Sequence, residues 1–153
     1  MKFMTPLLVV RDMARSKAFY TELLGLEIVT DLGANVTLTG GIALQTLESW
    51  QGFIEKEEIS FGGGCGELYF ETFGIEEFAE KCAEKGVPLV HPLKEHGWGQ
   101  RVIRIYDPDG HILEIGEAMP AVVQRFLDSG MSIEQVAQRM GIPLEYLTQP
   151  PQG

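Results

Sequence analysis

The feature that most constrains the fold of this chain of 153 residues is an internal repeat. Alternating apolar residues and a helical spacing of apolar residues predict the same order of elements twice, namely a strand, a helix and three strands. When Thr5 is aligned with Glu67, the glycines that end the two predicted helices, Gly25 and Gly86, agree to within one residue. A repeated unit buries its apolar face against its copy, so we expect one structural domain built from two modules.

Turn and capping residues set the boundaries of the two modules. Asp12 is a favoured N-cap residue before the first predicted helix, and the glycine-rich stretch FGGGCG precedes the second copy. The expected fold class is α+β, with strands over 5–10, 26–32, 35–39, 41–47, 67–72, 88–92, 100–107 and 111–117, and the second helix over 75–85. The expected organisation is a first βαβββ module over 1–47, a linker over 48–66, a second βαβββ module over 67–117 and a C-terminal helical tail over 118–153.

Composition argues against several function classes. The chain has 22 acidic against 12 basic residues and a net charge of −10, which repels nucleic-acid phosphates and anionic membranes. Its apolar runs are far shorter than the roughly 20 residues that span a bilayer, and the opening stretch MKFMTPLLVV is too short for a signal peptide. Two cysteines without CxxC spacing fit reduced thiols. We therefore expect a cytoplasmic protein that binds neither nucleic acid nor membrane.

The repeat also places polar residues at equivalent strand positions. When the last strands of the two copies are aligned on the glycines that precede them, Gln45 falls on Glu114, just as Thr5 falls on Glu67. Glu114 stands among apolar residues in HILEIGE, where a buried carboxylate without a partner is costly. The alternative is that a strand glutamate faces solvent, as most do. Copies packed about a pseudo-twofold axis bring corresponding strands together, so the four side chains are expected to converge.

Three stretches carry a resemblance to a known family. They are DMARSKAFYTELLG from Asp12 to Gly25, WGQR from Trp98 to Arg101, and DPDGHILEI from Asp107. With the paired βαβββ units, they are similar to the vicinal oxygen chelate superfamily, which includes glyoxalases, extradiol dioxygenases, epimerases, fosfomycin-modifying enzymes and bleomycin-resistance proteins. The likeness covers residues 3–117. It implies that the two modules form a curved mixed sheet around a cavity.

The resemblance further implies a divalent metal ion, Ni, Mn, Zn or Mg, held by the first and last strands of each unit. Matched by position, its ligands are Gln45, Glu67 and Glu114, oxygen donors that suit such ions. Thr5 departs from the pattern, because the superfamily usually has a stronger donor there. The two-carboxylate set is closest to glyoxalase-like lyases and isomerases acting on a small oxygen-chelating substrate. In such enzymes the metal stabilises an enediolate, and Glu67 or Glu114 would be the catalytic base.

A second function is also open, that of a metal-free protein of the bleomycin-resistance type that binds an antibiotic or a metabolite. Thr5 and the acidic charge favour it, and the charge suits an aromatic or cationic ligand. The stretch HGWGQR supplies Trp98 and an arginine for stacking and an anion contact at a cavity mouth, with His96 as a further candidate for substrate binding, although Trp98 could instead pack at a strand bulge. Arg101 and Arg104 are further candidates for substrate binding, but both cannot face the cavity from one regular strand, and the sequence does not choose between them.

The tail follows the repeat and lies outside the resemblance. AVVQRFLDSG and SIEQVAQRMG are expected to form amphipathic helices, the second with Ser132 as N-cap. SIEQVAQRMGIPLEYL has a helix-turn-helix look, which raises a third hypothesis, a DNA-associated regulator. The positive charge of the whole tail comes only from Arg125 and Arg139, too little to hold phosphates. We expect the tail to pack on the sheet or on the second subunit of a homodimer.

Overall fold

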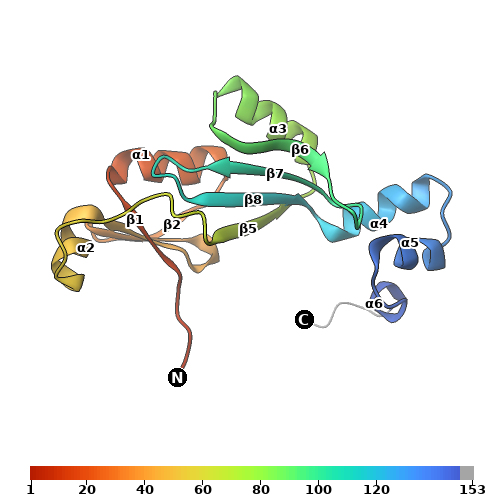
Figure 1. The fold of residues 1–153 in the computed structure, drawn as a ribbon, viewed down its shortest axis with the longest axis horizontal. Helices are drawn as coiled ribbons and strands as arrows, with labels where there is room; N and C mark the ends of the chain where they lie inside the picture. Colours follow the sequence, from red (N-terminus) through yellow and green to blue (C-terminus); the bar gives the residue numbers. More distant parts are fainter. Residues whose placement is uncertain (149–153) are drawn as a thin grey trace. The chain divides into compact units, whose positions relative to one another are not determined.

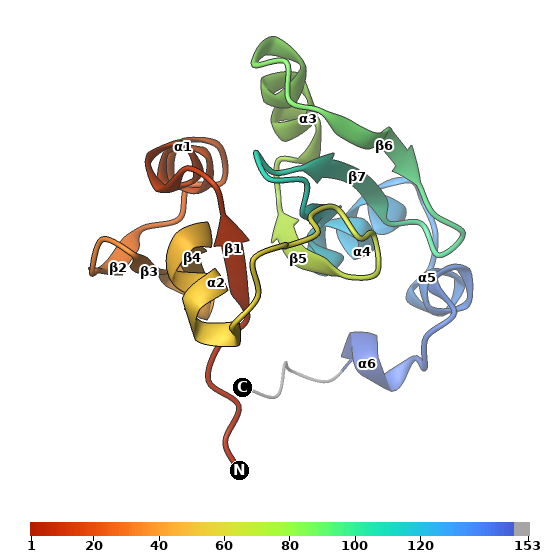
Figure 2. The ribbon, with the colours of Figure 1, turned by 60° about the vertical axis from the view of Figure 1, so that its left-hand side comes forward.

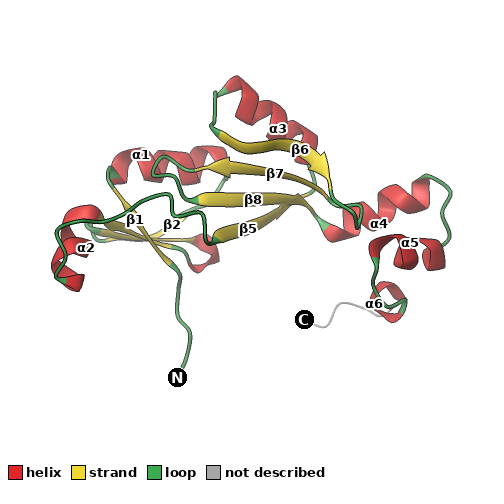
Figure 3. Ribbon diagram, in the orientation of Figure 1, coloured by secondary structure: helices red, strands yellow, loops and turns green. Residues whose placement is uncertain are grey.

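A computed structural model of the chain describes residues 1–148 and contains the predicted repeat (Figures 1 and 3). The first copy comprises β1 (Leu7–Val10), α1 (Met13–Ala18), a π-helical turn (Phe19–Leu23), β2 (Ile28–Asp31), β3 (Asn35–Leu38), a 3₁₀ turn (Thr39–Gly41) and β4 (Ala43–Thr46). After α2 (Leu47–Ile54), the second copy comprises β5 (Glu67–Thr72), α3 (Ile75–Glu84), β6 (Leu89–Glu95), β7 (Arg101–Tyr106) and β8 (Ile112–Glu117). The tail comprises α4 (Met119–Asp128), α5 (Ile133–Met140) and α6 (Glu145–Thr148); the last residues of the predicted tail, 149–153, lie outside the described part.

The two copies build sheets of the same strand order, which confirms the repeat. One sheet has the order β1-β4-β3-β2 and the other the order β5-β8-β7-β6, so the first and last strands of each copy are neighbours. In the first sheet β1 pairs with β4 in parallel, while β3 pairs with β4 and β2 in antiparallel fashion. The α+β class with two βαβββ units is therefore confirmed, and neither sheet is closed.

Local chemistry explains the helix ends. The Asp12 carboxylate accepts a hydrogen bond of 2.9 Å from the Arg15 backbone amide, as expected of an N-cap. Gly25 has a φ of 71° after the first helix and Gly86 a φ of 63° after α3, a conformation that favours glycine. In the tail, the Ser132 hydroxyl and the Gln135 side chain cap α5 reciprocally, so the predicted N-cap is confirmed.

Two elements differ from the sequence prediction. Residues 48–66 were expected as linker, yet α2 occupies Leu47–Ile54 and ends at Glu55 in the left-handed conformation. Strand β6 extends to Glu95 rather than ending at Pro92. Proline is tolerated there because β6 is the edge strand of its sheet and its pairing with β7 shifts register on both sides of His91.

The residues group into two compact units. The first comprises Met1–Glu67, Gly86–Pro88 and Tyr106–Leu113, and the second comprises Leu68–Lys85, Leu89–Ile105 and the chain from Glu114 on. In the first unit α1 packs on β4, and α2 contacts β4 and β1 (Figure 2). Its core contains the following buried side chains: Val10, Tyr20, Leu23, Val36, Leu38, Ile42 and Leu44.

The second unit has a sheet core and a separate helical core. Ile75 and Cys82 of α3 and Val102, Ile103 and Ile105 of β7 are buried. The tail has its own cluster of Val122, Phe126, Val136 and Met140, around which further apolar side chains of α4, α5 and α6 pack. Among the helices described, none combines the length and apolar character needed to cross a lipid bilayer.

Candidate functional site

The sheet of the second unit carries charged side chains on both faces. Side chains alternate along a strand, so Arg101 and Arg104 of β7, three residues apart, face opposite sides. Glu114 and Glu117 of β8 do the same. Arg104 pairs with Glu114 on one face, and Arg101 pairs with Glu117 on the other. Each buried carboxylate thus has a guanidinium partner on its own face.

The face with Arg104 and Glu114 also carries two histidines. Glu114 is 8% exposed and forms an ion pair with Arg104. One guanidinium nitrogen of Arg104, Nη1, lies 3.2 Å from His91 Nε2 and 3.4 Å from His96 Nε2. A neutral imidazole accepts such a hydrogen bond whereas a protonated one cannot. Burial, together with the charges of Arg104 and Lys94, lowers the pKa of His96 below its ordinary value of 6.5.

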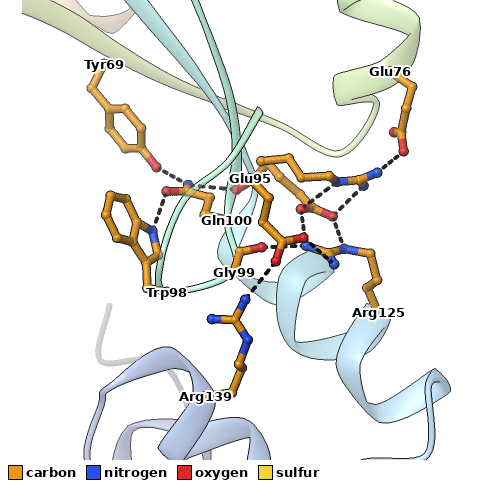
Figure 4. Close-up of polar contacts among 10 residues, drawn as sticks. Tyr69, Glu76, Glu95, Trp98, Gly99, Gln100, Arg125 and Arg139 are labelled. Atoms are coloured by element: carbon orange, nitrogen blue, oxygen red, sulfur yellow. Dashed lines mark hydrogen bonds and ion pairs between the residues drawn. The ribbon is translucent and has the colours of Figure 1, made fainter. Parts of the chain in front are cut away.

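Aromatic side chains border the same face. The Trp98 ring stacks on His96, with centroids 4.5 Å apart and planes inclined by 6°. Trp98 Nε1 donates to Gln100 Oε1 at 3.1 Å, Gln100 Nε2 donates to the Tyr69 hydroxyl at 2.8 Å, and Tyr69 donates to Glu71 at 2.7 Å (Figure 4 shows the first two bonds). Burial and the bond to Glu71 raise the pKa of Tyr69. Trp98 and Tyr69 remain 43% and 50% exposed, so both rings are accessible for stacking.

Gly116 makes room for this chain of hydrogen bonds. A Cβ at this position in β8 would stand 2.6 Å from Gln100 Nε2 and 3.1 Å from the Tyr69 ring. Gln100 also donates to the Glu117 backbone carbonyl at 2.9 Å, which fixes its amide across β8. Tyr69 and Gln100 were missed by the sequence analysis, although Gln100 lies inside the quoted WGQR stretch.

The opposite face of the sheet holds the buried carboxylate of Glu117. Arg101 donates to it at 2.7 and 3.0 Å, and Arg125 of α4 donates to it at 2.9 and 3.1 Å (Figure 4). Burial alone would raise the pKa of Glu117, but the hydrogen bonds from Arg101 and Arg125 outweigh it and lower the pKa to about 2. Glu117 stands three residues after Glu114 in the same strand, so the two carboxylates face opposite sides of the sheet. This spacing was the signal in the sequence that could have predicted a cationic partner on each face. The prediction that Arg101 binds substrate stays a prediction.

In the first unit, the D-P-D-G turn forms a buried polar cluster on α1. The Asp107 carboxylate accepts hydrogen bonds from Tyr20 at 2.9 Å, from His111 Nδ1 at 2.8 Å and from two backbone amides. Asp109 accepts from Ser16 and from Arg11, and both aspartates are almost fully buried. This stretch, part of the motif that carried the resemblance, therefore fixes the turn to the helix.

The predicted ligand Gln45 and Thr5, which the repeat aligned with Glu67, are each engaged by protein groups in the first unit. Gln45 is 3% exposed, its Oε1 accepts from Asn35 at 2.8 Å, and its amide nitrogen donates to Ser49. Asn35 and Gln45 are register partners in β3 and β4, which accounts for the contact. The Thr5 hydroxyl donates to the Gly41 carbonyl. Glu67 begins β5, exposed and on the same side of that strand as Tyr69 and Glu71.

Paired βαβββ units with ligand-capable side chains on the sheet faces define the vicinal oxygen chelate superfamily. The chain belongs to the family of glyoxalase-like domains, whose match covers residues 3–120. It is similar to the crystal structure of a protein of unknown function from Agrobacterium tumefaciens str. C58, with 40% identity, a TM-score of 0.71, and 78% of this chain and 95% of that chain covered. The predicted resemblance is confirmed.

Two further solved structures are similar. A glyoxalase-related enzyme from Fulvimarina pelagi shares 23% identity at a TM-score of 0.66, with 76% of this chain and 87% of that chain covered. A lactoylglutathione lyase from Agrobacterium tumefaciens shares 25% identity at a TM-score of 0.59, with 76% of this chain and 93% of that chain covered. Among curated proteins, none matches the chain.

Members of this superfamily commonly use divalent metal ions, so the question is whether the donor side chains of this chain can hold one. Across residues 1–148, no group of three or more His, Cys, Asp or Glu side chains is placed to hold a metal ion. The Glu114 carboxylate is neutralised by Arg104, and Gln45 Oε1 already accepts from Asn35. In the arrangement observed, these donors do not fit a divalent metal. Coordination through Glu67 together with Glu114 stays a prediction.

Proposed function

We propose that this chain is a non-catalytic, metal-independent binding protein for planar aromatic cations. The observation that carries the proposal is the ion pair between Arg104 and Glu114. A guanidinium stands at the carboxylate that a metal would need, so the charge of Glu114 is balanced by the protein itself. This arrangement supports a binding face rather than a Lewis-acid centre.

The neighbouring side chains determine the ligand class. The stacked pair of Trp98 and His96 and the half-exposed Tyr69 ring offer flat apolar surface, which suits a planar aromatic compound. Glu71 is exposed on the same face, and the chain has a net charge of −10, so a cation is favoured over an anion. The amide of Gln100 supplies a fixed polar group beside the rings.

A binding experiment with two probes of opposite charge tests the proposal. In a Trp50→Phe background Trp98 is the sole tryptophan, and its emission reports ligand stacking. We expect proflavine, a planar aromatic cation, to quench Trp98 and to bind at least about tenfold more tightly than pyrenesulfonate at low salt. Trp98→Leu should weaken proflavine binding. Equal affinity for the two probes, or no saturable quenching, would contradict the proposal.

A second candidate is a glyoxalase-like metal-dependent lyase or isomerase. The similarity to a lactoylglutathione lyase and the carboxylate of Glu67 on the Tyr69 side of β5 favour it. Elemental analysis of protein purified without chelator separates the two candidates. Stoichiometric Ni, Mn, Zn or Mg, with a rise in melting temperature on metal addition and formation of lactoylglutathione, would replace the binding proposal.

We also propose that the chain forms a homodimer. The first unit exposes several large apolar side chains that water solvates poorly, and a second copy would cover such a surface. They are Phe3, Met4, Val29, Leu32 and Phe53. Light scattering during size-exclusion chromatography measures the mass directly. A mass near 17 kDa, that of one chain, at micromolar concentration would contradict the dimer.

A further inference from the structure

The loop that carries His96 and Trp98 is a tight turn between β6 and β7. The His96 backbone amide donates to the Gln100 carbonyl at 2.9 Å, and the Gly99 amide donates to the His96 carbonyl at 2.9 Å. These bonds satisfy the inward-facing groups of the turn. The carbonyls of Gly97 and Gly99 are left for partners outside it.

The C-terminal helices supply those partners. Arg139 of α5 donates to the Gly97 carbonyl, and Arg125 of α4 donates to the Gly99 carbonyl at 2.5 Å. The same two arginines bind Glu95, where β6 ends, at 2.8 Å and 3.3 Å. Both ends of the turn are therefore held by charged side chains of the tail (Figure 4).

The ion pairs continue through the unit as one alternating series. Glu76 of α3 pairs with Arg101, Arg101 with Glu117, and Glu117 with Arg125. Arg125 then pairs with Glu95, and Glu95 with Arg139. Such a network holds its members in place better than isolated surface pairs, because each group between the two ends of the series is restrained by two partners. It joins the sheet, α3, α4 and α5 at the base of the His96–Trp98 loop.

Packing holds the same loop. Gly99 is buried with a φ of 92°, and a Cβ there would overlap the Phe126 ring of α4. The Phe126 ring is itself held under the guanidinium groups of Arg125 and Arg139, at 4.9 Å and 5.5 Å. The backbone of the turn thus lies directly on the tail.

From these contacts we infer that the C-terminal helices position the aromatic pair of the binding face, and that Arg139 and Phe126 act as positioning residues for Trp98. The ligand named in this inference rests on the proposed function, whereas the restraint on the loop follows from the contacts alone. Helices α5 and α6 lie beyond the family match, which ends at residue 120. The tail is thus an addition to the common domain that acts on its binding loop.

The test compares Arg139→Ala with Gln138→Ala, its exposed neighbour on α5, in the Trp50→Phe background. Without ligand, we expect greater acrylamide quenching and lower anisotropy of Trp98 in Arg139→Ala only. With proflavine, we expect about a threefold to tenfold weaker affinity, because an unrestrained loop must be ordered on binding. Arg139→Lys, which keeps the charge, should recover part of both effects. Measurements are made well below the melting temperature of every variant.

Glu95→Gln removes the ion pairs of Arg125 and Arg139 with the end of β6 and keeps the experiment decisive if Arg139→Ala folds poorly. Unchanged Trp98 quenching and anisotropy in both variants would overturn the inference. If the unaltered protein fails to bind proflavine while the variants still loosen Trp98, the proposed function fails and the positioning role stands. If proflavine binds with the same affinity to all variants while Trp98 is loosened, the role in binding is overturned.

Discussion

The hydroxyl of Tyr20 and the carboxylate of Asp107, 87 residues apart in the chain, are joined by a hydrogen bond of 2.9 Å inside the first unit. Tyr20 is fully buried and Asp107 is 4% exposed. Burial and the nearby carboxylate raise the pKa of Tyr20, whereas the bonds from His111 and Tyr20 lower the pKa of Asp107 despite its burial. The D-P-D-G turn is thereby tied to the helical segment that Asp12 caps, and two stretches of the family motif become one structural element.

Tyr20→Phe tests the strength of this connection. The substitution removes one donor from a buried carboxylate and leaves the ring packing intact, so we expect a loss of about 1.5–3 kcal/mol in the free energy of unfolding. Tyr146→Phe, at a 72% exposed tyrosine, is the matched control and should change stability by less than about 0.5 kcal/mol. Urea unfolding at pH 7 measures both. Equal effects of the two substitutions would show that the bond contributes nothing.

Local signals were sufficient for most of the fold. Asp12, Gly25 and Ser132 each act within one turn of backbone, so their positions in the sequence predict where helices begin and end. Because side chains alternate along a strand, the sequence of β8 likewise predicts that Glu114 and Glu117 face opposite sides of the sheet. The repeat then predicted the same order of strands and helix twice along the chain.

Pairing between distant residues could not be read from the sequence. Arg104 meets Glu114, and Arg125 meets Glu117, only because particular strands and helices are neighbours in space. Glu114 was predicted as a metal ligand, because a carboxylate in an apolar strand needs a cation and the local sequence pattern does not say which cation that is. Helix α2 was missed because its segment precedes a glycine-rich stretch and was assigned with it to a linker.

Glu117→Gln should remove an acid-sensitive part of the stability. The pKa of Glu117 is about 2 in the folded protein against an ordinary 4.5, so its ionised form stabilises the fold fully above pH 4.5. That contribution is lost as the pH falls from 4.5 towards 2, and a shift of this size corresponds to roughly 3 kcal/mol. We expect the unfolding free energies of the unaltered protein and the variant to differ at pH 7 and to converge near pH 2.

Urea unfolding over this pH range checks the expectation for Glu117. Glu58→Gln, at an exposed glutamate, is the control and should show no pH-dependent difference from the unaltered protein. Asp107 also has a lowered pKa, but it is present in every variant and cancels from the comparison. A stability gap that stays constant from pH 7 to pH 2 would mean that ionisation of Glu117 is not what stabilises the cluster.

Gly99→Ala should be more damaging than Gly130→Ala, although the two glycines have nearly the same φ. Their φ values are 92° and 95°, so both substitutions incur strain of about 1–2 kcal/mol. Gly130 has open space where a Cβ would stand, whereas at Gly99 that Cβ would overlap Phe126. We expect about 1–3 kcal/mol of additional destabilisation at Gly99 from this overlap. Urea unfolding measures both, and equal losses would contradict the packing of the loop on α4.

Arg104→Gln should raise the pKa of His96. Burial is the larger cause of the low pKa and Arg104 the next, so we expect a partial return towards 6.5. NMR titration of the imidazole signals, assigned with a His96→Gln variant, measures the change. Lys85→Gln, which removes an exposed positive charge, is the matched control and should leave the His96 titration unaltered.

Because the folded pKa of His96 lies below 6.5, neutral His96 stabilises the fold above pH 6.5, and this contribution is lost as the pH falls through the folded pKa. Protonation also ends the capacity of Nε2 to accept from Arg104, so acidification should loosen the Trp98 stack in the unaltered protein. An unchanged His96 pKa in Arg104→Gln would show that the guanidinium does not set the charge state of this face.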